Sequence, residues 1–315
     1  ETYGEDPYLT GRMGVAFVQS LQGDDPHYLK LVATPKHFAV HSGPEAKRHT
    51  FDAQVSPRDL YQSYLPHFKA CIQAGGARSI MGAYNRTNGE ACCASPTLLE
   101  DILRQTWGFT GYVVSDCWAI RDIYQNHHLV ETPAQAATLA VEAGCDLNCG
   151  ETYPALREAL AKGLIDEATL DRSLTRLFTA RFRLGMFDPP ELVPYAHIPV
   201  EVNDCAAHRA LALQAARESI VLLKNENDLL PLDKHTPSIA LIGPLADDSE
   251  MLLGNYNGTP SHAVTLLEGI ARKMAPQTRL THARGCPLAL GLPLLEPIPG
   301  DCLWTGVPQE SQTGL

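Results

Sequence analysis

The stretch that decides the fold is Tyr112-Val113-Val114-Ser115-Asp116-Cys117. Its first four residues form a short apolar run suited to a buried strand, and the run ends directly in a carboxylate. Buried strands that end in charged side chains are typical of parallel α/β sheets, which place their chemistry beyond the carboxyl ends of the strands. The stretch therefore predicts a strand over 112–115, with Asp116 as the first candidate for catalysis.

Other parts of the chain repeat this pattern of a short apolar run that ends in polar residues. Short apolar runs at 31–34, at 79–83 and just before Asp146 each end in polar residues, which are Lys36-His37, Tyr84-Asn85 and Asp146-Asn148. Helical periodicity between the runs predicts helices over 8–22, 57–74, 96–106, 133–143, 154–162 and 166–184. The alternation predicts an α/β fold, a partial TIM-type (β/α) barrel of about four units, since a closed barrel has eight strands.

In one of these helices the buried face can be named. Its apolar side chains recur at the i, i+3, i+4, i+8 spacing of a helix stripe, and they are Leu99, Ile102, Leu103 and Trp107. We expect this stripe to face the core.

The composition changes after Gly185. Residues 186–202 contain several prolines and predict an extended linker. Beyond it, helices over 204–218 and 263–274 and strands over 219–223 and 238–243 predict a second α/β layer, so that 203–290 is the start of a second α/β sandwich domain. Residues 291–315 lose all periodicity and predict a loop-like tail.

Charge and hydropathy exclude two classes of partner. The formal net charge is −11, whereas tracking a phosphate backbone needs clustered Lys and Arg, so no nucleic-acid partner is expected. The longest apolar runs fall far short of the ~20 residues needed to cross a bilayer, which predicts a soluble protein with no membrane partner. No basic segment followed by an apolar signal segment comes after Glu1, so the sequence does not predict the localisation. A periplasmic or secreted protein is compatible with it.

The nine cysteines do not predict a metal site. Cys92 and Cys93 are adjacent, Cys145 and Cys149 lie four apart, and no histidine pair follows at ligand spacing. We therefore expect no metal and no cofactor. Polar strand ends without a phosphate loop or a metal cluster favour a hydroxyl-rich small substrate and carboxylate chemistry, a description that sugars meet.

Several longer strings are more specific. The chain resembles glycoside hydrolase family 3 in ETYGEDPYL (1–9), KHF (36–38), MGAYN (81–85), GFTGYVVSD (108–116) and AGCDLNCG (143–150), and in ESIVLLKN (218–225) and LPL (230–232) of a second domain. The resemblance covers nearly the whole chain. It implies that 1–185 is the C-terminal part of a (β/α)8 catalytic barrel, and that 291–315 approaches an inserted module of the PA14 type.

The resemblance also implies a mechanism and its residues. Asp116 matches the nucleophile of a retaining, exo-acting β-glycosidase, which works through a covalent glycosyl-aspartate. Lys36 and His37 match an adjacent pair that binds sugar hydroxyls and is often joined by a cis peptide bond. Tyr84 and Met81 would contact the nucleophile or the sugar. Arg48 would form bidentate hydrogen bonds with sugar hydroxyls, and Lys47 is the alternative residue for this role.

Within the family the chain is most similar to the β-xylosidase branch, on HSGPE (41–45), RHTFDA (48–53), SDCWAI (115–120) and GNYNGTPS (254–261). This implies hydrolysis of terminal non-reducing β-D-xylosyl or β-D-glucosyl residues, as in xylan breakdown. The substrate would be a small oligosaccharide or an aryl or alkyl β-glycoside; the oligomeric state is unknown. Trp118 departs from the small or acidic residue common in that branch. Cys117 and Cys149 either bridge neighbouring loops, as in similar xylosidases, or are two free thiols.

The general acid/base of the family matches no residue here, and Glu5 and Glu45 do not fit that role. Ala39 replaces a proline of the branch that uses a His–Asp pair, so His49 and Asp52 are not expected to form that pair, although they remain the best candidates for residual proton transfer. Alternatives are therefore a catalytically incomplete sugar-binding fragment, a β-glucosidase or α-L-arabinofuranosidase specificity and, more distantly, a metal-dependent barrel hydrolase.

Overall fold

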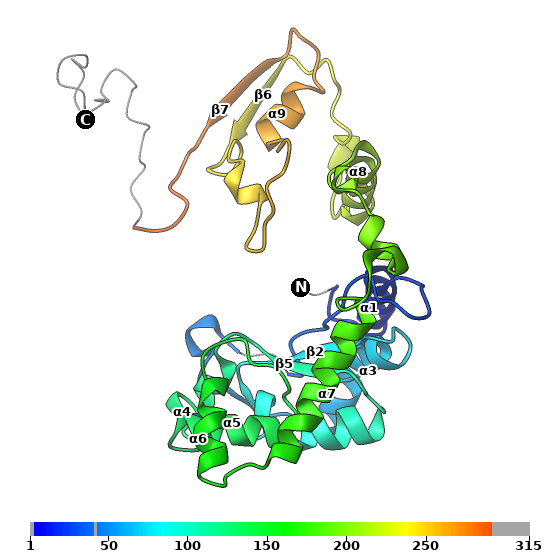
Figure 1. Cartoon of the computed structure of the whole chain (residues 1–315). Coiled ribbons are helices and arrows are strands. Elements are labelled where there is room, and N and C mark those ends of the chain that lie inside the picture. Colours follow the sequence, from blue (N-terminus) through cyan, green and yellow to red (C-terminus); the bar gives the residue numbers. More distant parts are fainter. Residues whose placement is uncertain (1–2, 41–42, 292–315) are drawn as a thin grey trace, which may run out of the picture. The chain divides into compact units, whose positions relative to one another are not determined.

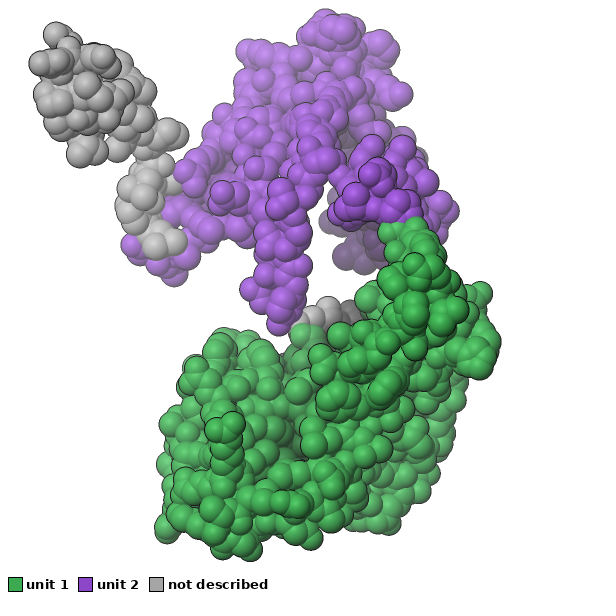
Figure 2. Space-filling model, viewed as in Figure 1, with its two compact units in different colours: residues 1–198 green, residues 199–315 purple. Residues whose placement is uncertain are grey.

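The structure is a computed structural model that describes residues 3–40 and 43–291. The chain divides into two compact units, residues 1–198 and 199–315 (Figures 1 and 2). The predicted loop-like tail lies outside the described residues from 292 onward, and so do Glu1, Thr2, His41 and Ser42 of the quoted strings. Helices and strands alternate in both units, so the predicted α/β class is confirmed.

The centre of the first unit is a parallel pair of strands, β2 (Ser79–Gly82) and β5 (Tyr112–Ser115), with Met81 opposite Val114. A parallel bridge joins Phe38 to the end of β2, and another joins Leu147 to β5. Four chain segments therefore lie side by side, parallel and in sequence order. This order places Phe38, the ends of β2 and β5, and Leu147 at one edge, with Lys36-His37 directly before Phe38.

Helices follow each strand and carry the apolar faces that cover the pair. In unit 1 they are α1 (Pro7–Gln22), α2 (Pro57–Asp59), α3 (Pro66–Gln73), α4 (Ala119–Gln125), α5 (Pro133–Glu142), α6 (Leu156–Ala161) and α7 (Glu167–Arg183), with π-helical stretches at Leu60–Tyr64 and Pro96–Thr106. Several begin at a side-chain cap. Asp6, Ser95 and Asp166 each accept a backbone N–H of the first turn.

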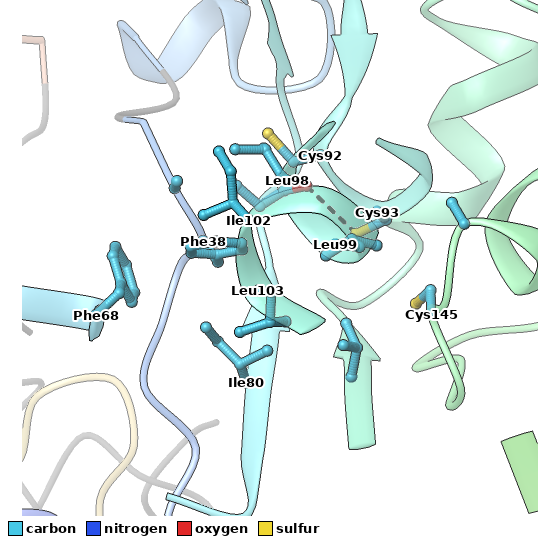
Figure 3. Close-up of a cluster of buried hydrophobic side chains, with 14 of the residues drawn as sticks. Phe38, Phe68, Ile80, Cys92, Cys93, Leu98, Leu99, Ile102, Leu103 and Cys145 are labelled. Atoms are coloured by element: carbon cyan, nitrogen blue, oxygen red, sulfur yellow. Dashed lines mark hydrogen bonds between the residues drawn. The ribbon is translucent and has the colours of Figure 1, made fainter. Parts of the chain in front are cut away.

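The core forms where these helices meet the strands. Phe38 and Ile80 are fully buried there with Leu99 and Leu103 (Figure 3). The ring of Phe38 lies edge-on to Phe68, with centroids 5.2 Å apart. The predicted stripe of 96–106 is confirmed, since all four of its residues are buried. Burying Phe38 fixes the backbone that immediately follows the Lys36-His37 pair.

The predicted strand at 31–34 is wrong. That segment has no regular strand geometry, and pairing with β2 begins later, where Pro35 accepts the N–H of Met81 at 3.1 Å and Phe38 donates to the Met81 carbonyl at 2.8 Å. The apolar run is half exposed at Leu31. A small three-stranded sheet in unit 1 was not predicted: β1 (Asp52–Ala53) pairs with β3 (Arg86–Thr87), and β3 with β4 (Glu90–Ala91).

The proline-rich segment is not extended over its whole length. It forms 3-10 turns at Pro190–Leu192, Pro194–His197 and Val200–Val202. Val193 is buried, and the Tyr195 hydroxyl accepts the N–H of Asp25 at 3.2 Å. Prolines fix φ at values that suit such turns as well as extended chain, and the packing of Val193 and Tyr195 within unit 1 favours the turns at 190–197.

In the second unit, β6 (Ser238–Ile242) and β7 (Arg279–Ala283) pair in parallel, with α9 (Leu266–Ala271) between them in the sequence. The helix α8 (Ala206–Ser219) confirms the helix predicted over 204–218. The strand predicted over 219–223 is wrong: its side chains are exposed, and it joins no strand among the described residues. A β-prone run becomes a strand only when a partner completes its hydrogen bonds.

Candidate active site

Asp116 follows the last residue of β5, at the edge where the four parallel segments end. Its N–H donates to the carbonyl of Gly82 at 3.2 Å, which ties it to the end of β2. Its Oδ1 accepts the N–H of Cys117 at 2.8 Å, so the carboxylate is oriented by its own backbone. The side chain is 14% exposed. It is therefore held firmly and still reachable from solvent.

The Lys36-His37 pair lies against this carboxylate. The His37 Nε2 is 3.1 Å from Asp116 Oδ2, and the charge of Lys36 also acts on Asp116. The Lys36–His37 peptide bond is cis, as the resemblance implies, and the Phe38–Ala39 bond is cis as well. The two predicted residues are thus brought to the predicted nucleophile from a segment almost 80 positions earlier.

Opposing effects set the ionisation of Asp116. Burial acts to raise the pKa of its carboxyl group, while hydrogen bonds from His37 and the Cys117 amide and the charges of His37 and Lys36 act to lower it. The balance holds the pKa of Asp116 below its ordinary value. The carboxylate is consequently ionised at neutral pH, which a nucleophile requires.

Tyr84 and Arg48 complete the cluster. Burial raises the pKa of Tyr84 to about 12, and the neighbouring Asp116 carboxylate, with which the Tyr84 side chain interacts, adds to the effect. The phenol therefore keeps its proton and can donate it in a hydrogen bond. The Arg48 guanidinium lies over the Tyr84 ring, 5.7 Å from its centroid, and forms an ion pair with Glu45. Arg48 thus lies in the cluster, paired with Glu45.

Two further residues of the predicted rim are Met81 and Asp146. The contacts of Met81 described above are made by its backbone, which holds residues 35–38 against β2. Asp146 is buried rather than at the rim: its carboxylate accepts the Val113 N–H and pairs with Arg104 and Arg176, each at 2.9 Å. A carboxylate between two guanidinium groups in the interior serves the fold, because those charges compensate one another.

Cys117 and Cys149 form a disulfide, so of the two alternatives the bridge is the one observed. The bridge joins the residue after Asp116 to the loop that follows residue 147. The Trp118 N–H donates to the Cys149 carbonyl at 2.6 Å, and the Cys149 N–H to the Ser115 hydroxyl at 3.0 Å. The backbone on either side of Asp116 is therefore cross-linked to the neighbouring loop.

His49 and Asp52, the candidates for residual proton transfer, do not pair with each other. Asp52 accepts from the Gly89 N–H and the Gln54 amide, whereas His49 Nδ1 lies 2.7 Å from Asp122 Oδ2. Asp122 was missed because helix α4 was not predicted. A signal was present, since this carboxylate stands between the apolar residues Ile120 and Ile123 of a buried helix.

Among the described residues, no three His, Cys, Asp or Glu side chains come together as a metal site needs, and no helix there is long and apolar enough to cross a membrane. The site offers an ionised carboxylate ringed by an imidazole, an ammonium, a phenol and a guanidinium. Such a set can attack an electrophilic carbon while hydrogen-bonding several hydroxyl groups.

Two family models match the chain. The glycosyl hydrolase family 3 N-terminal domain matches residues 1–180, and the glycosyl hydrolase family 3 C-terminal domain matches residues 220–298. A xylan 1,4-β-xylosidase of Xylanibacter ruminicola is 47% identical over 292 residues, which are 91% of this chain and 34% of that protein. The probable β-D-xylosidase 7 of Arabidopsis thaliana is 43% identical over 86% of this chain and 37% of its own.

Solved structures agree with these matches. An exo-β-xylosidase of the same family, in complex with a xylobiose aziridine activity-based probe, is 33% identical with a TM-score of 0.85, over 91% of this chain and 38% of that one. A β-glucosidase from Listeria innocua in complex with glucose is 31% identical with a TM-score of 0.80, over 92% and 40%. The chain spans about a third of the length of the curated relatives it matches.

Proposed function

The chain belongs to glycoside hydrolase family 3, and on that premise we propose that it supplies the nucleophile half of a retaining, exo-acting β-glycosidase. Its substrates are terminal non-reducing β-D-xylosyl residues, with β-D-glucosyl residues as the alternative, in small oligosaccharides from plant polysaccharide. The observation that carries the proposal is the contact of Asp116 with His37, which keeps a rim carboxylate ionised and oriented.

The reaction proceeds by double displacement. An Oδ atom of Asp116 bonds to the anomeric carbon as the bond to the leaving oxygen breaks, and that oxygen takes a proton from a general acid. Water then attacks the glycosyl-aspartate, gives its proton to the same group, and releases both the sugar and the Asp116 carboxylate. No described residue is assigned as this acid/base.

The remaining side chains of the cluster bind the sugar. Lys36 and His37 donate hydrogen bonds to the sugar hydroxyls. Arg48 donates further hydrogen bonds after it leaves Glu45 and binds the substrate. Tyr84 donates its hydroxyl proton to Asp116 or to the sugar. Met81 supplies apolar contact. These roles rest on the clustering of four of the five residues around Asp116 or Tyr84.

We propose further that residues 1–185 are the C-terminal part of a (β/α)8 barrel, supported by the four parallel segments in sequence order. Residues 186–202 are then the linker to an α/β sandwich domain that starts at 203–290. A specificity for α-L-arabinofuranosides is a second candidate, because a β-xylosidase/α-L-arabinofuranosidase of Medicago sativa is 38% identical over 91% of this chain and 38% of its own.

The test is Asp116→Asn in the full-length protein, assayed on aryl β-xyloside, β-glucoside and α-L-arabinofuranoside. We expect hydrolysis of the preferred glycoside to fall by roughly 1,000-fold or more, because an amide cannot form the glycosyl ester. Asp101→Asn, on an exposed face of the 96–106 helix, is the matched control and keeps full turnover. Unchanged turnover in Asp116→Asn ends the proposal, and full binding of xylose without turnover in the unsubstituted protein favours a sugar-binding role instead.

A further inference from the structure

A second histidine–carboxylate pair runs beside the first. His37 reaches Asp116 just after β5, and His49 reaches Asp122 on the helix α4 that follows. Both histidines come from the segment between residue 36 and β1, and both carboxylates come from the segment after β5. The same two parts of the chain are therefore joined twice, once at the proposed nucleophile and once behind it.

The carboxylate of the second pair is fully buried. Asp122 has no exposed side-chain surface; its Oδ1 accepts from the Asn126 amide at 2.6 Å and its Oδ2 faces His49 Nδ1 at 2.7 Å. A buried carboxylate must be matched by donors, and the His49 Nδ1–H is one of them. This bond fixes the orientation of an imidazole that is otherwise 44% exposed.

The fixed imidazole packs against Tyr84. The two rings lie edge to face, with centroids 4.8 Å apart and planes at 70°. The same tyrosine carries Arg48 over its ring, and it lies two residues beyond Gly82, whose carbonyl accepts the Asp116 N–H. Contacts thus run from buried Asp122 through His49 to Tyr84, which follows the end of β2 beside Asp116 at the end of β5.

We propose that His49 is a positioning residue that acts through Tyr84. Held by Asp122, its ring keeps the Tyr84 phenol turned toward Asp116, so that the hydroxyl is in place when the sugar reacts. The inference rests on the proposed function for its effect on turnover. Its structural part, the orientation of Tyr84, stands on the contacts alone. Because the ring acts on a group that meets the reacting carboxylate, its loss lowers kcat more than it raises KM.

The variant that isolates this role is His49→Asn in the full-length protein. An asparagine amide can stand where Nδ1 stands and donate to Asp122, so the buried carboxylate keeps its partner while the ring is lost from Tyr84. We expect kcat on an aryl β-xyloside to fall roughly 10- to 100-fold, with KM changed by less than about threefold and the thermal midpoint retained. His128→Asn, at an exposed position with φ 54° that asparagine accepts, is the matched control and keeps the original kcat.

A double-mutant cycle with Tyr84→Phe tests whether His49 works through the phenol. If it does, His49→Asn adds no further loss of kcat once the hydroxyl is gone, so the double variant equals Tyr84→Phe. Losses that multiply overturn the proposal, as does an unaltered kcat in either single variant.

A crystal structure of His49→Asn keeps the test independent of the proposed function. The Tyr84 hydroxyl is expected to have left Asp116, and an unmoved Tyr84 overturns the inference whether or not the protein hydrolyses glycosides. If Asp116→Asn leaves turnover intact, the proposed function fails, and this structural comparison still decides the role of His49.

Discussion

The imidazole of His37 lies 3.1 Å from the carboxylate of Asp116, two residues that stand almost 80 positions apart in the chain. The contact exists because residues 35–38 and β5 flank β2 on its two sides, with Phe38 bridged to Gly82 and Ser115 opposite Gly82. The ends of the two flanking segments therefore meet over the end of the central strand. The geometry of the sheet makes a histidine–carboxylate pair out of two residues that share no local sequence.

That contact predicts a pH effect. The His37 hydrogen bond favours the ionised form of Asp116 and helps to hold its pKa below the ordinary value of 3.8. His37→Ala removes the bond, so the pKa of Asp116 rises and the acid limb of kcat/KM moves to higher pH. At the optimum, kcat/KM falls about tenfold or more, the cost of one hydrogen bond to a charged group.

The measurement is the pH–rate profile of the full-length protein on an aryl β-xyloside. His27→Ala, which removes an exposed histidine whose backbone carbonyl binds Arg183, is the control and leaves the acid limb in place. An acid limb that stays put, or moves to lower pH, in His37→Ala would show that His37 does not stabilise the Asp116 carboxylate.

The bridge between Cys117 and Cys149 predicts a loss of stability on its removal. It closes a loop of 32 positions, and removing such a constraint costs about 4 kcal/mol in the chain-entropy account. We expect the double variant Cys117→Ser/Cys149→Ser to unfold at lower urea concentration than the oxidised protein, and to lose the sensitivity to reductant that this bridge confers.

Cys286→Ser is the matched control, because Cys286 is an exposed free cysteine, and its urea midpoint stays that of the unsubstituted protein. The disulfide-linked peptide containing Cys117 and Cys149, identified by mass spectrometry without reduction, is the direct check. Equal midpoints for the double variant and the oxidised protein contradict a stabilising role.

The buried position of Asp146 predicts a structural defect. Its carboxylate compensates Arg104, which is 8% exposed, and Arg176, and burial already lowers the pKa of Arg104 below its ordinary value. Asp146→Asn leaves both guanidinium groups without their counter-charge. We expect a loss of about 3 kcal/mol in the free energy of unfolding, while the folded fraction keeps its kcat.

Urea unfolding together with the kcat of active-site-titrated enzyme checks this result. Glu158→Gln breaks an exposed pair with Lys162 and is the control, expected to change the free energy of unfolding by less than about 1 kcal/mol. A stable Asp146→Asn with reduced kcat would place Asp146 in the reaction after all.

Much of the fold could be predicted because it is local. The periodicity of 96–106 predicts its buried stripe, and the apolar run before Asp116 predicts β5, since both patterns need only neighbouring residues. The run at 219–223 shows where this fails: its residues favour a strand, and it joins no strand in the described part of the chain. Strand formation depends on a partner that local sequence does not contain.

The candidate site divides in the same way. Asp116 and Tyr84 could be found from strings that end strands, because a parallel sheet gathers those ends. Lys36 and His37 could be found only from the family string KHF, since no strand forms over 31–34. The roles of Asp146 and Asp122 could not be predicted in this way. The residues around each of them in the sequence do not distinguish a buried structural carboxylate from one at the active site. Burial and the arrival of Arg104, Arg176 or His49 from elsewhere distinguish them.

The sequence by itself determined the α/β alternation, the carboxylate after β5 and the family to which the chain belongs, because these depend on periodicity and on strings of adjacent residues. Only the tertiary structure decided which histidine meets which carboxylate: His37 meets Asp116, and His49 meets Asp122, 73 positions away, rather than Asp52, three away. The physical reason is that a charge pair depends on distance in space and on burial, and both are set by the packing of β2, β5 and α4.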